Sequence, residues 1–86
     1  MSDIITPIVN SNGTSLVELA KQHTECWEAA NSLADKLRAA MPHGRDYQNY
    51  PTDSEYKLAR DQHLARIVSA EAIARDAYFF AMFFRK

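Results

Sequence analysis

The chain has 86 residues and a formal net charge of −1, from ten basic and eleven acidic side chains. This length allows one small domain. Such a domain buries only about two thirds of the surface of its unfolded chain, and it is marginally stable without a disulfide, a structural metal or a partner. The balanced charge argues against DNA and anionic membranes as partners, and the single cysteine, Cys26, excludes an internal disulfide and a cysteine-rich zinc framework.

Residues 1–13 are expected to form an irregular arm, because Asn10 to Gly13 is a cluster of turn-forming residues. We expect the arm to pack on another part of the molecule through its apolar side chains Ile4, Ile5, Ile8 and Val9. The start of the chain lacks the basic and apolar regions of a signal peptide, and the apolar run near its end is shorter than the roughly 20 residues of a membrane span. These features predict a protein of the cytoplasm, with no membrane partner.

A first helix is expected over residues 15–41. Ser15 and Glu18 have the spacing of a capping box, in which each side chain satisfies a free backbone amide. Apolar residues then recur every three or four positions, from Leu16 through Trp27 to Met41, as on the buried face of an amphipathic helix. Pro42 disfavours helical geometry at Met41 and sets the end.

A second helix is expected over residues 52–85, after a loop at 42–51. Thr52 and Glu55 form another candidate capping box. With two helices, no strand pattern and few turn residues, the chain is predicted to be all-α: one domain, folded as an antiparallel helical hairpin with a short N-terminal arm.

The unequal helix lengths predict an overhang. The helices would span about 38 Å and about 50 Å, and a hairpin folded about the loop would leave about two turns of the second helix uncovered at its aromatic end. It would also place His23 level with Glu71, and His63 level with Asn31. Exposed aromatic area marks an interface. We therefore expect a homo-oligomer, at least a dimer with a helical-bundle core, whose interface residues are Trp27, Tyr78, Phe79, Phe80, Phe83 and Phe84.

No pattern of catalytic residues is recognisable, so the chain is predicted not to be an enzyme and to need no cofactor. Cys26 lies on an apolar stripe without a base beside it, and the serines lie in no known motif. His23 and Cys26 at helical spacing lack a third metal ligand, which predicts no metal site. The simpler interpretation of His23 and His63 is a histidine hydrogen-bonded across the two helices.

The loop is the best candidate for a binding site. It combines a cation, a titratable ring and two flat aromatic side chains, and basic residues follow on the second helix. Arginine forks onto phosphate or carboxylate, and tyrosine stacks on a base. The predicted ligand-binding residues are His43, Arg45, Tyr47, Tyr50, Lys57, Arg60 and Arg66. A thin hairpin is expected to lack a concavity of ligand size, which would place the ligand between chains. The alternative interpretation is that the tyrosines only plug the open end of the hairpin.

His43-Gly44-Arg45-Asp46-Tyr47, followed by Ala59, His63 and Arg66 at helical spacing, resembles a pattern in small phage- and prophage-encoded helical-hairpin proteins of unsettled function. The resemblance covers the second half of the chain. It implies a phage accessory protein acting in the host cytoplasm, with inhibition of host defence as one role of such proteins.

Two functions are therefore expected. The first is sequestration of a small anionic, nucleotide-like ligand by an oligomer. The second is that of a protein-protein interaction inhibitor or adaptor, which binds a partner such as a host defence protein through the aromatic C-terminal end or the 42–51 loop. A structural oligomer without a ligand is the remaining alternative.

Overall fold

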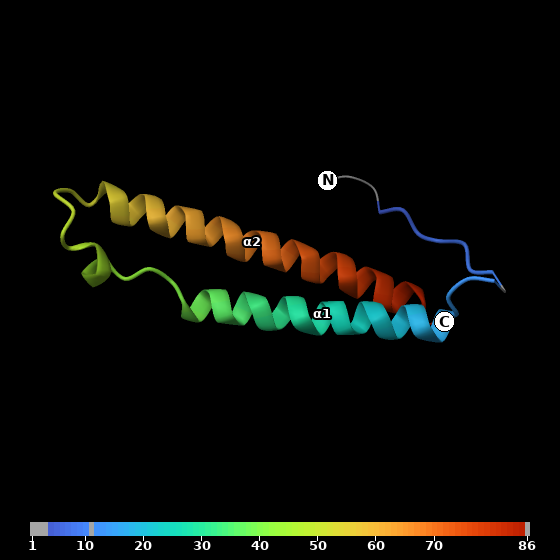
Figure 1. Cartoon of the computed structure of the whole chain (residues 1–86). Helices are drawn as coiled ribbons and strands as arrows, with labels where there is room; N and C mark the ends of the chain where they lie inside the picture. Colours follow the sequence, from blue (N-terminus) through green and yellow to red (C-terminus); the bar gives the residue numbers. More distant parts are fainter. Residues whose placement is uncertain (1–3, 11, 86) are drawn as a thin grey trace.

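The computed structural model describes residues 4–10 and 12–85, and within these residues it contains helices and no strands. Two long helices, α1 (Leu16–Ala39) and α2 (Ser54–Phe83), lie side by side, joined by a loop that contains the short 3-10 helix η1 (Gly44–Tyr47) (Figure 1). The predicted all-α hairpin is confirmed at this level. The molecule measures 63 × 23 × 18 Å, and its radius of gyration is 18.4 Å. A compact chain of this length has a radius of about 12 Å, so the hairpin is a thin rod.

Helix α1 begins as the capping pattern predicts. Ser15 has extended backbone angles, and its hydroxyl oxygen accepts a hydrogen bond from the backbone N–H of Glu18 at 3.2 Å. The regular helix ends at Ala39, two residues before the predicted end. Lys36 and Arg38 lie in the last turn, where positive charge complements the helix dipole.

Helix α2 begins later than the sequence predicts. The Thr52 hydroxyl donates to the Glu55 carboxylate at 2.9 Å, so the two expected partners do meet. However, Thr52 is not the capping residue: Asp53 occupies that position, without a side-chain hydrogen bond to the backbone, and the helix starts at Ser54. The predicted start at residue 52 is therefore wrong by two residues, and the helix ends at Phe83 instead of residue 85.

The contact between the helices is made largely by alanine. Seven of the nine buried apolar residues are alanines, and the other two are Ile67 and Phe84. Ala70 and Ala81 are fully buried. Alanine lets two helix backbones approach closely but removes little apolar surface from water. The helices therefore lie close together along this seam, but the seam buries little apolar surface.

The axial register of the hairpin differs from the expected one. His63 lies against Leu37 instead of Asn31, and His23 lies against Phe80 instead of Glu71. As Figure 1 shows, α2 extends beyond α1 at the loop end, while its C-terminal end is level with the start of α1. The cause is the loop, which does not turn tightly at its midpoint but folds as η1 along the first turns of α2.

The aromatic end is consequently paired within the chain. The His23 ring stacks on Phe80, with centroids 4.5 Å apart, and lies 5.7 Å from the ring of Phe84. Phe84 is only 2% exposed, and Trp27 contacts Tyr78 across the helices at 5.2 Å. The predicted aromatic overhang is therefore wrong. Tyr78, Phe79 and Met82 stay substantially exposed, but on the flank of a covered helix end.

The segment before α1 has no regular secondary structure at residues 4–10. Ile4 is half-buried, whereas Ile5 is 89% and Ile8 is 91% exposed. The expected packing of this segment through all its apolar side chains is therefore not observed within one chain. Residues 1–3 and 11 of the predicted arm lie outside the described residues.

Candidate ligand site at the loop end

A cavity of about 540 Å³ opens where the end of α1, the loop and the first turns of α2 meet. Its lining residues come from all three segments: Ala40, Met41, Pro42, Asp46, Tyr47, Tyr50, Ala59, Gln62, His63 and Arg66. Ligand pockets typically measure about 300–1,000 Å³. The expectation that one hairpin lacks a concavity of ligand size is therefore wrong, because the extra length of α2 and the folded loop build one together.

Three tyrosines form one wall of this region. Tyr47 stacks on Tyr50 with ring centroids 6.1 Å apart, and it contacts Tyr56 of α2 at 6.0 Å. The turn is held by backbone bonds, from the Asp46 N–H to the His43 carbonyl at 3.0 Å and from the Tyr50 N–H to the Tyr47 carbonyl at 3.3 Å. Tyr47 is half-buried, whereas Tyr50 keeps 53% of its surface exposed. Tyr47 therefore anchors the loop on α2, and Tyr50 leaves an aromatic surface open.

His63 links the two helices at the floor of the cavity. Its Nε2 lies 2.5 Å from the backbone carbonyl oxygen of Leu37. A carbonyl only accepts, so Nε2 carries the hydrogen and donates, and the neutral ring then presents a lone pair at Nδ1. Leu37 lies in the last turn of α1, where its carbonyl accepts a turn-type hydrogen bond from the Ala40 N–H at 3.1 Å and can accept a second one from His63. His63 is therefore a cap supplied to α1 by α2, and this explains a buried polar ring in an apolar seam.

Arg66 is the cation of the cavity. Its Nη1 lies 3.5 Å from His63 Nδ1, which accepts from it at long range. Among the residues that the structure describes, Arg66 forms no ion pair with a carboxylate. The guanidinium therefore keeps most of its donors available. Asp46 also lines the cavity and supplies a carboxylate that accepts hydrogen bonds.

Only part of the predicted ligand-binding set comes together. Tyr47, Tyr50 and Arg66 line the cavity, whereas His43, Arg45, Lys57 and Arg60 are exposed and do not line it. Sequence reasoning missed Asp46, Gln62 and His63. The three-residue spacing of His63 and Arg66 was a usable signal, because it places both side chains on neighbouring positions of one helix.

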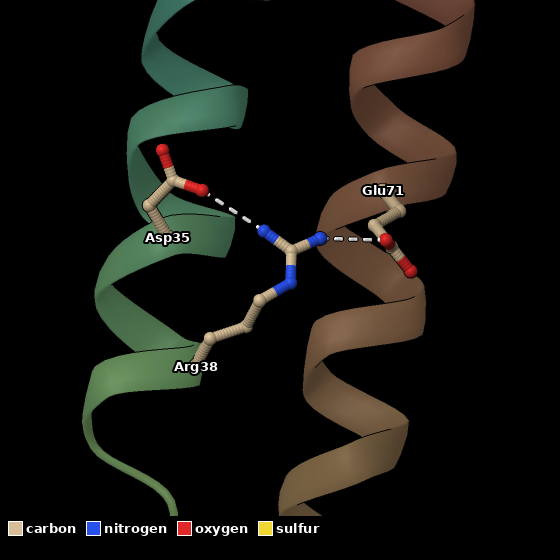
Figure 2. A network of polar contacts seen from close by, with 3 residues as sticks. All are labelled: Asp35, Arg38 and Glu71. Carbon is tan, nitrogen blue, oxygen red and sulfur yellow. Dashed lines mark hydrogen bonds and ion pairs between the residues drawn. The ribbon is translucent and has the colours of Figure 1, made fainter.

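A second polar cluster lies further along the hairpin and has a different character. Arg38 of α1 binds Asp35 at 2.9 Å and Glu71 of α2 at 2.7 Å, as Figure 2 shows. Both acidic groups already neutralise this guanidinium, and all three side chains are roughly half exposed or more. The cluster ties the helices together, and its one cation is already paired with two carboxylates, so it offers no free positive charge to an anionic ligand.

Comparisons with protein-family models, with curated proteins and with solved structures found no match to this chain. Among the described residues, no group of three or more His, Cys, Asp or Glu is arranged to hold a metal ion. In the same part of the chain, no helix is both long and apolar enough to cross a membrane. The site must therefore be interpreted from its own geometry.

Proposed function

We propose that this chain is a non-enzymatic binding module that sequesters a small anionic, nucleotide-like ligand in the loop-end cavity. The observation that carries the proposal is Arg66, a cation without a carboxylate partner that shares a cavity of about 540 Å³ with the stacked rings of Tyr47 and Tyr50. A guanidinium recognises phosphate or carboxylate with two parallel hydrogen bonds, and an exposed tyrosine stacks on a flat base.

The remaining side chains give the site a preference. His63 accepts from Arg66 and orients the guanidinium. Asp46 repels a bare polyanion but accepts hydrogen bonds from hydroxyl or amino groups. A ligand with one anionic end and several donors elsewhere satisfies both charges. This combination favours a nucleotide over inorganic phosphate.

Calorimetric titration with a panel of linear and cyclic nucleotides tests the proposal. We expect Arg66→Ala to weaken binding by about 10- to 100-fold, the equivalent of about 1.4–2.7 kcal/mol. Arg45→Ala is the matched control, because Arg45 is also an exposed loop-end arginine but does not line the cavity. Binding should weaken with salt, since exposed charges are screened over about 8 Å at physiological ionic strength.

Two outcomes would overturn this function. One is that no nucleotide binds at low salt. The other is that Arg45→Ala and Arg66→Ala weaken binding equally, because the ligand would then lie outside the cavity.

We also propose that the chain associates with itself. Its accessible surface is 6664 Å², whereas a compact protein of 9.8 kDa has about 5,200 Å². The excess, about 1,500 Å², is larger than the roughly 800 Å² that each partner buries in a standard protein interface. A thin hairpin with an alanine seam therefore carries enough surplus surface for a stable dimer. Sedimentation equilibrium at micromolar concentration tests this, and a monomer there would refute it.

The second candidate function is that of a protein-protein interaction inhibitor or adaptor. It is favoured by Tyr78, Phe79 and Met82, which are 46%, 44% and 39% exposed beside one another on the last turns of α2. Large exposed apolar side chains that gather in one place mark interaction sites. If no nucleotide binds and Phe79→Asp abolishes co-purification of a cellular protein, this function replaces the first. Three predictions rest on the resemblance alone: a role as a phage accessory protein, action against host defence, and location in the host cytoplasm.

A further inference from the structure

The two sides of the hairpin differ in chemistry along α1 and around the middle of α2. On one side, many positions that follow a core residue are polar or charged: Lys21, Asn31, Asp35 and Arg38 on α1, and Glu71 and Arg75 on α2. The other positions of α2 that follow a buried residue are the exposed apolar Leu64, Val68, Tyr78 and Met82. This side carries the Arg38 cluster of Figure 2. It is a solvated surface.

The opposite side is formed by positions that precede each core residue. A groove of about 410 Å³ runs there between the helices, lined by Leu33 and Leu37 of α1 and by Ala65, Ser69 and Ile73 of α2, with Arg66 at one end. Leu33 is 50% and Ile73 is 58% exposed. Small and branched apolar side chains therefore line an open groove between the two helices.

Helix α2 carries two parallel seams with the spacing of a coiled coil. His63, Ile67, Ala70, Ala74, Ala77 and Ala81 face α1 and are buried. One residue before each of them stand Gln62, Arg66, Ser69, Ile73, Asp76 and Phe80. Both sets recur every four and three residues, the spacing of coiled-coil helices, and in the second set Ile73 and Phe80 are the apolar members. The first seam packs on α1. The second lies at the edge of that contact and is exposed at every position except Phe80, which stacks on His23 of α1.

We propose that the second seam, together with Leu33 and Leu37, is the surface on which a second copy of this chain docks. The inference deepens the self-association proposed above by placing the interface on one side of the hairpin. The occupant is another copy for two reasons. The surplus accessible surface of about 1,500 Å² exceeds the roughly 800 Å² that each partner buries in a standard interface, and the two unpaired charges of the seam complement each other across a two-fold axis.

The charges in the seam fix the orientation. Arg66 and Asp76 are its two charged residues, they have opposite signs, and neither forms an ion pair with another described residue. A two-fold axis makes residue i contact residue j and residue j contact residue i. If the two copies of α2 are antiparallel and the two-fold axis passes midway between Ser69 and Ile73, Arg66 of each chain meets Asp76 of the other. In the same arrangement, the branched Ile73 of one chain packs over the small Ser69 of the other.

This arrangement couples the dimer to the ligand cavity, because Arg66 also faces that cavity. An anionic ligand and Asp76 of the other chain approach the same guanidinium, so ligand binding is expected to weaken the dimer. The interface is therefore tested on protein without ligand.

Sedimentation equilibrium of Ile73→Lys, with Val68→Lys as the matched control, tests the surface. Both residues are branched and apolar on α2, with 58% and 60% of their surfaces exposed, but Val68 lies on the opposite side, the one that carries the Arg38 cluster. We expect Ile73→Lys to raise the dimer dissociation constant by at least about 100-fold, and Val68→Lys to change it by less than about threefold. Circular dichroism checks that both variants stay helical.

Charge reversal tests the orientation. Asp76→Arg places two arginines together and is expected to raise the dissociation constant about tenfold. Adding Arg66→Asp restores the pair with its signs exchanged, and the constant should return to within about threefold of wild type.

The possible outcomes distinguish the proposed docking surface from the proposal that the chain self-associates. A monomeric wild type refutes both. A dimeric wild type with an equally dimeric Ile73→Lys refutes the surface alone. A dimer that Ile73→Lys breaks, but that the double reversal does not restore, refutes the antiparallel pairing.

Discussion

Replacing His63 by leucine isolates the hydrogen bond that His63 makes across the hairpin. Leucine fills a similar volume in the buried seam, so the change removes the Nε2–H donor without opening a large cavity. The Leu37 carbonyl keeps its bond from the Ala40 N–H at 3.1 Å, so the loss is one partly compensated hydrogen bond, about 0.5–1.5 kcal/mol. Losing the acceptor that orients Arg66 adds a smaller amount. The expected cost is about 1–2 kcal/mol in the free energy of unfolding.

Thermal unfolding followed by circular dichroism measures this cost. A domain of this size changes its Tm by about 4–8 °C for each kcal/mol, so His63→Leu should lower the Tm by roughly 4–16 °C. All samples need the same protein concentration, because self-association makes the Tm concentration-dependent. His43→Leu is the control. His43 is exposed, caps no helix with its side chain and should change stability by less than about 0.5 kcal/mol.

The reasoning fails if His63→Leu is as stable as wild type or more stable. Such a result would mean that the ring is tolerated in the seam and does not hold the end of α1. A loss as large for His43→Leu would point to the loop as the source of the stability change.

Two further predictions concern the seam and the Arg38 cluster. Ala81→Leu should destabilise the hairpin by about 1–3 kcal/mol in urea unfolding, because Ala81 is fully buried and the helices must separate to fit the larger leucine. Ala72→Leu, at a half-buried position, is the control and should cost less, and equal losses would contradict a close seam. Arg38→Met should cost at most about 1 kcal/mol, since both ion pairs are well exposed. That cost should fall further at high salt, and a salt-independent loss would assign Arg38 a packing role instead.

The sequence alone was sufficient to predict the two helices. The three- and four-residue spacing of apolar side chains, the Ser15 cap and the break at Pro42 are local signals, and local signals specify helices well. The sequence also indicated the loop and Arg66 as candidate binding elements, because arginine and tyrosine crowd into one short stretch and the helix that follows it, and Tyr47, Tyr50 and Arg66 do line one cavity. Self-association, the ligand and the biological role stay predictions.

Only the tertiary structure decided how far one helix slides along the other. An alanine seam is nearly uniform along its length, so small side chains by themselves fit several axial registers. The selected register is the one in which His63 meets the Leu37 carbonyl, and in which His23 stacks on Phe80 and lies beside Phe84. That choice covers the aromatic end, uncovers the first turns of α2 and creates the cavity beneath the loop. The partners in these contacts are distant in sequence, and the loop length does not reveal how the loop folds, so no local pattern could have predicted the register.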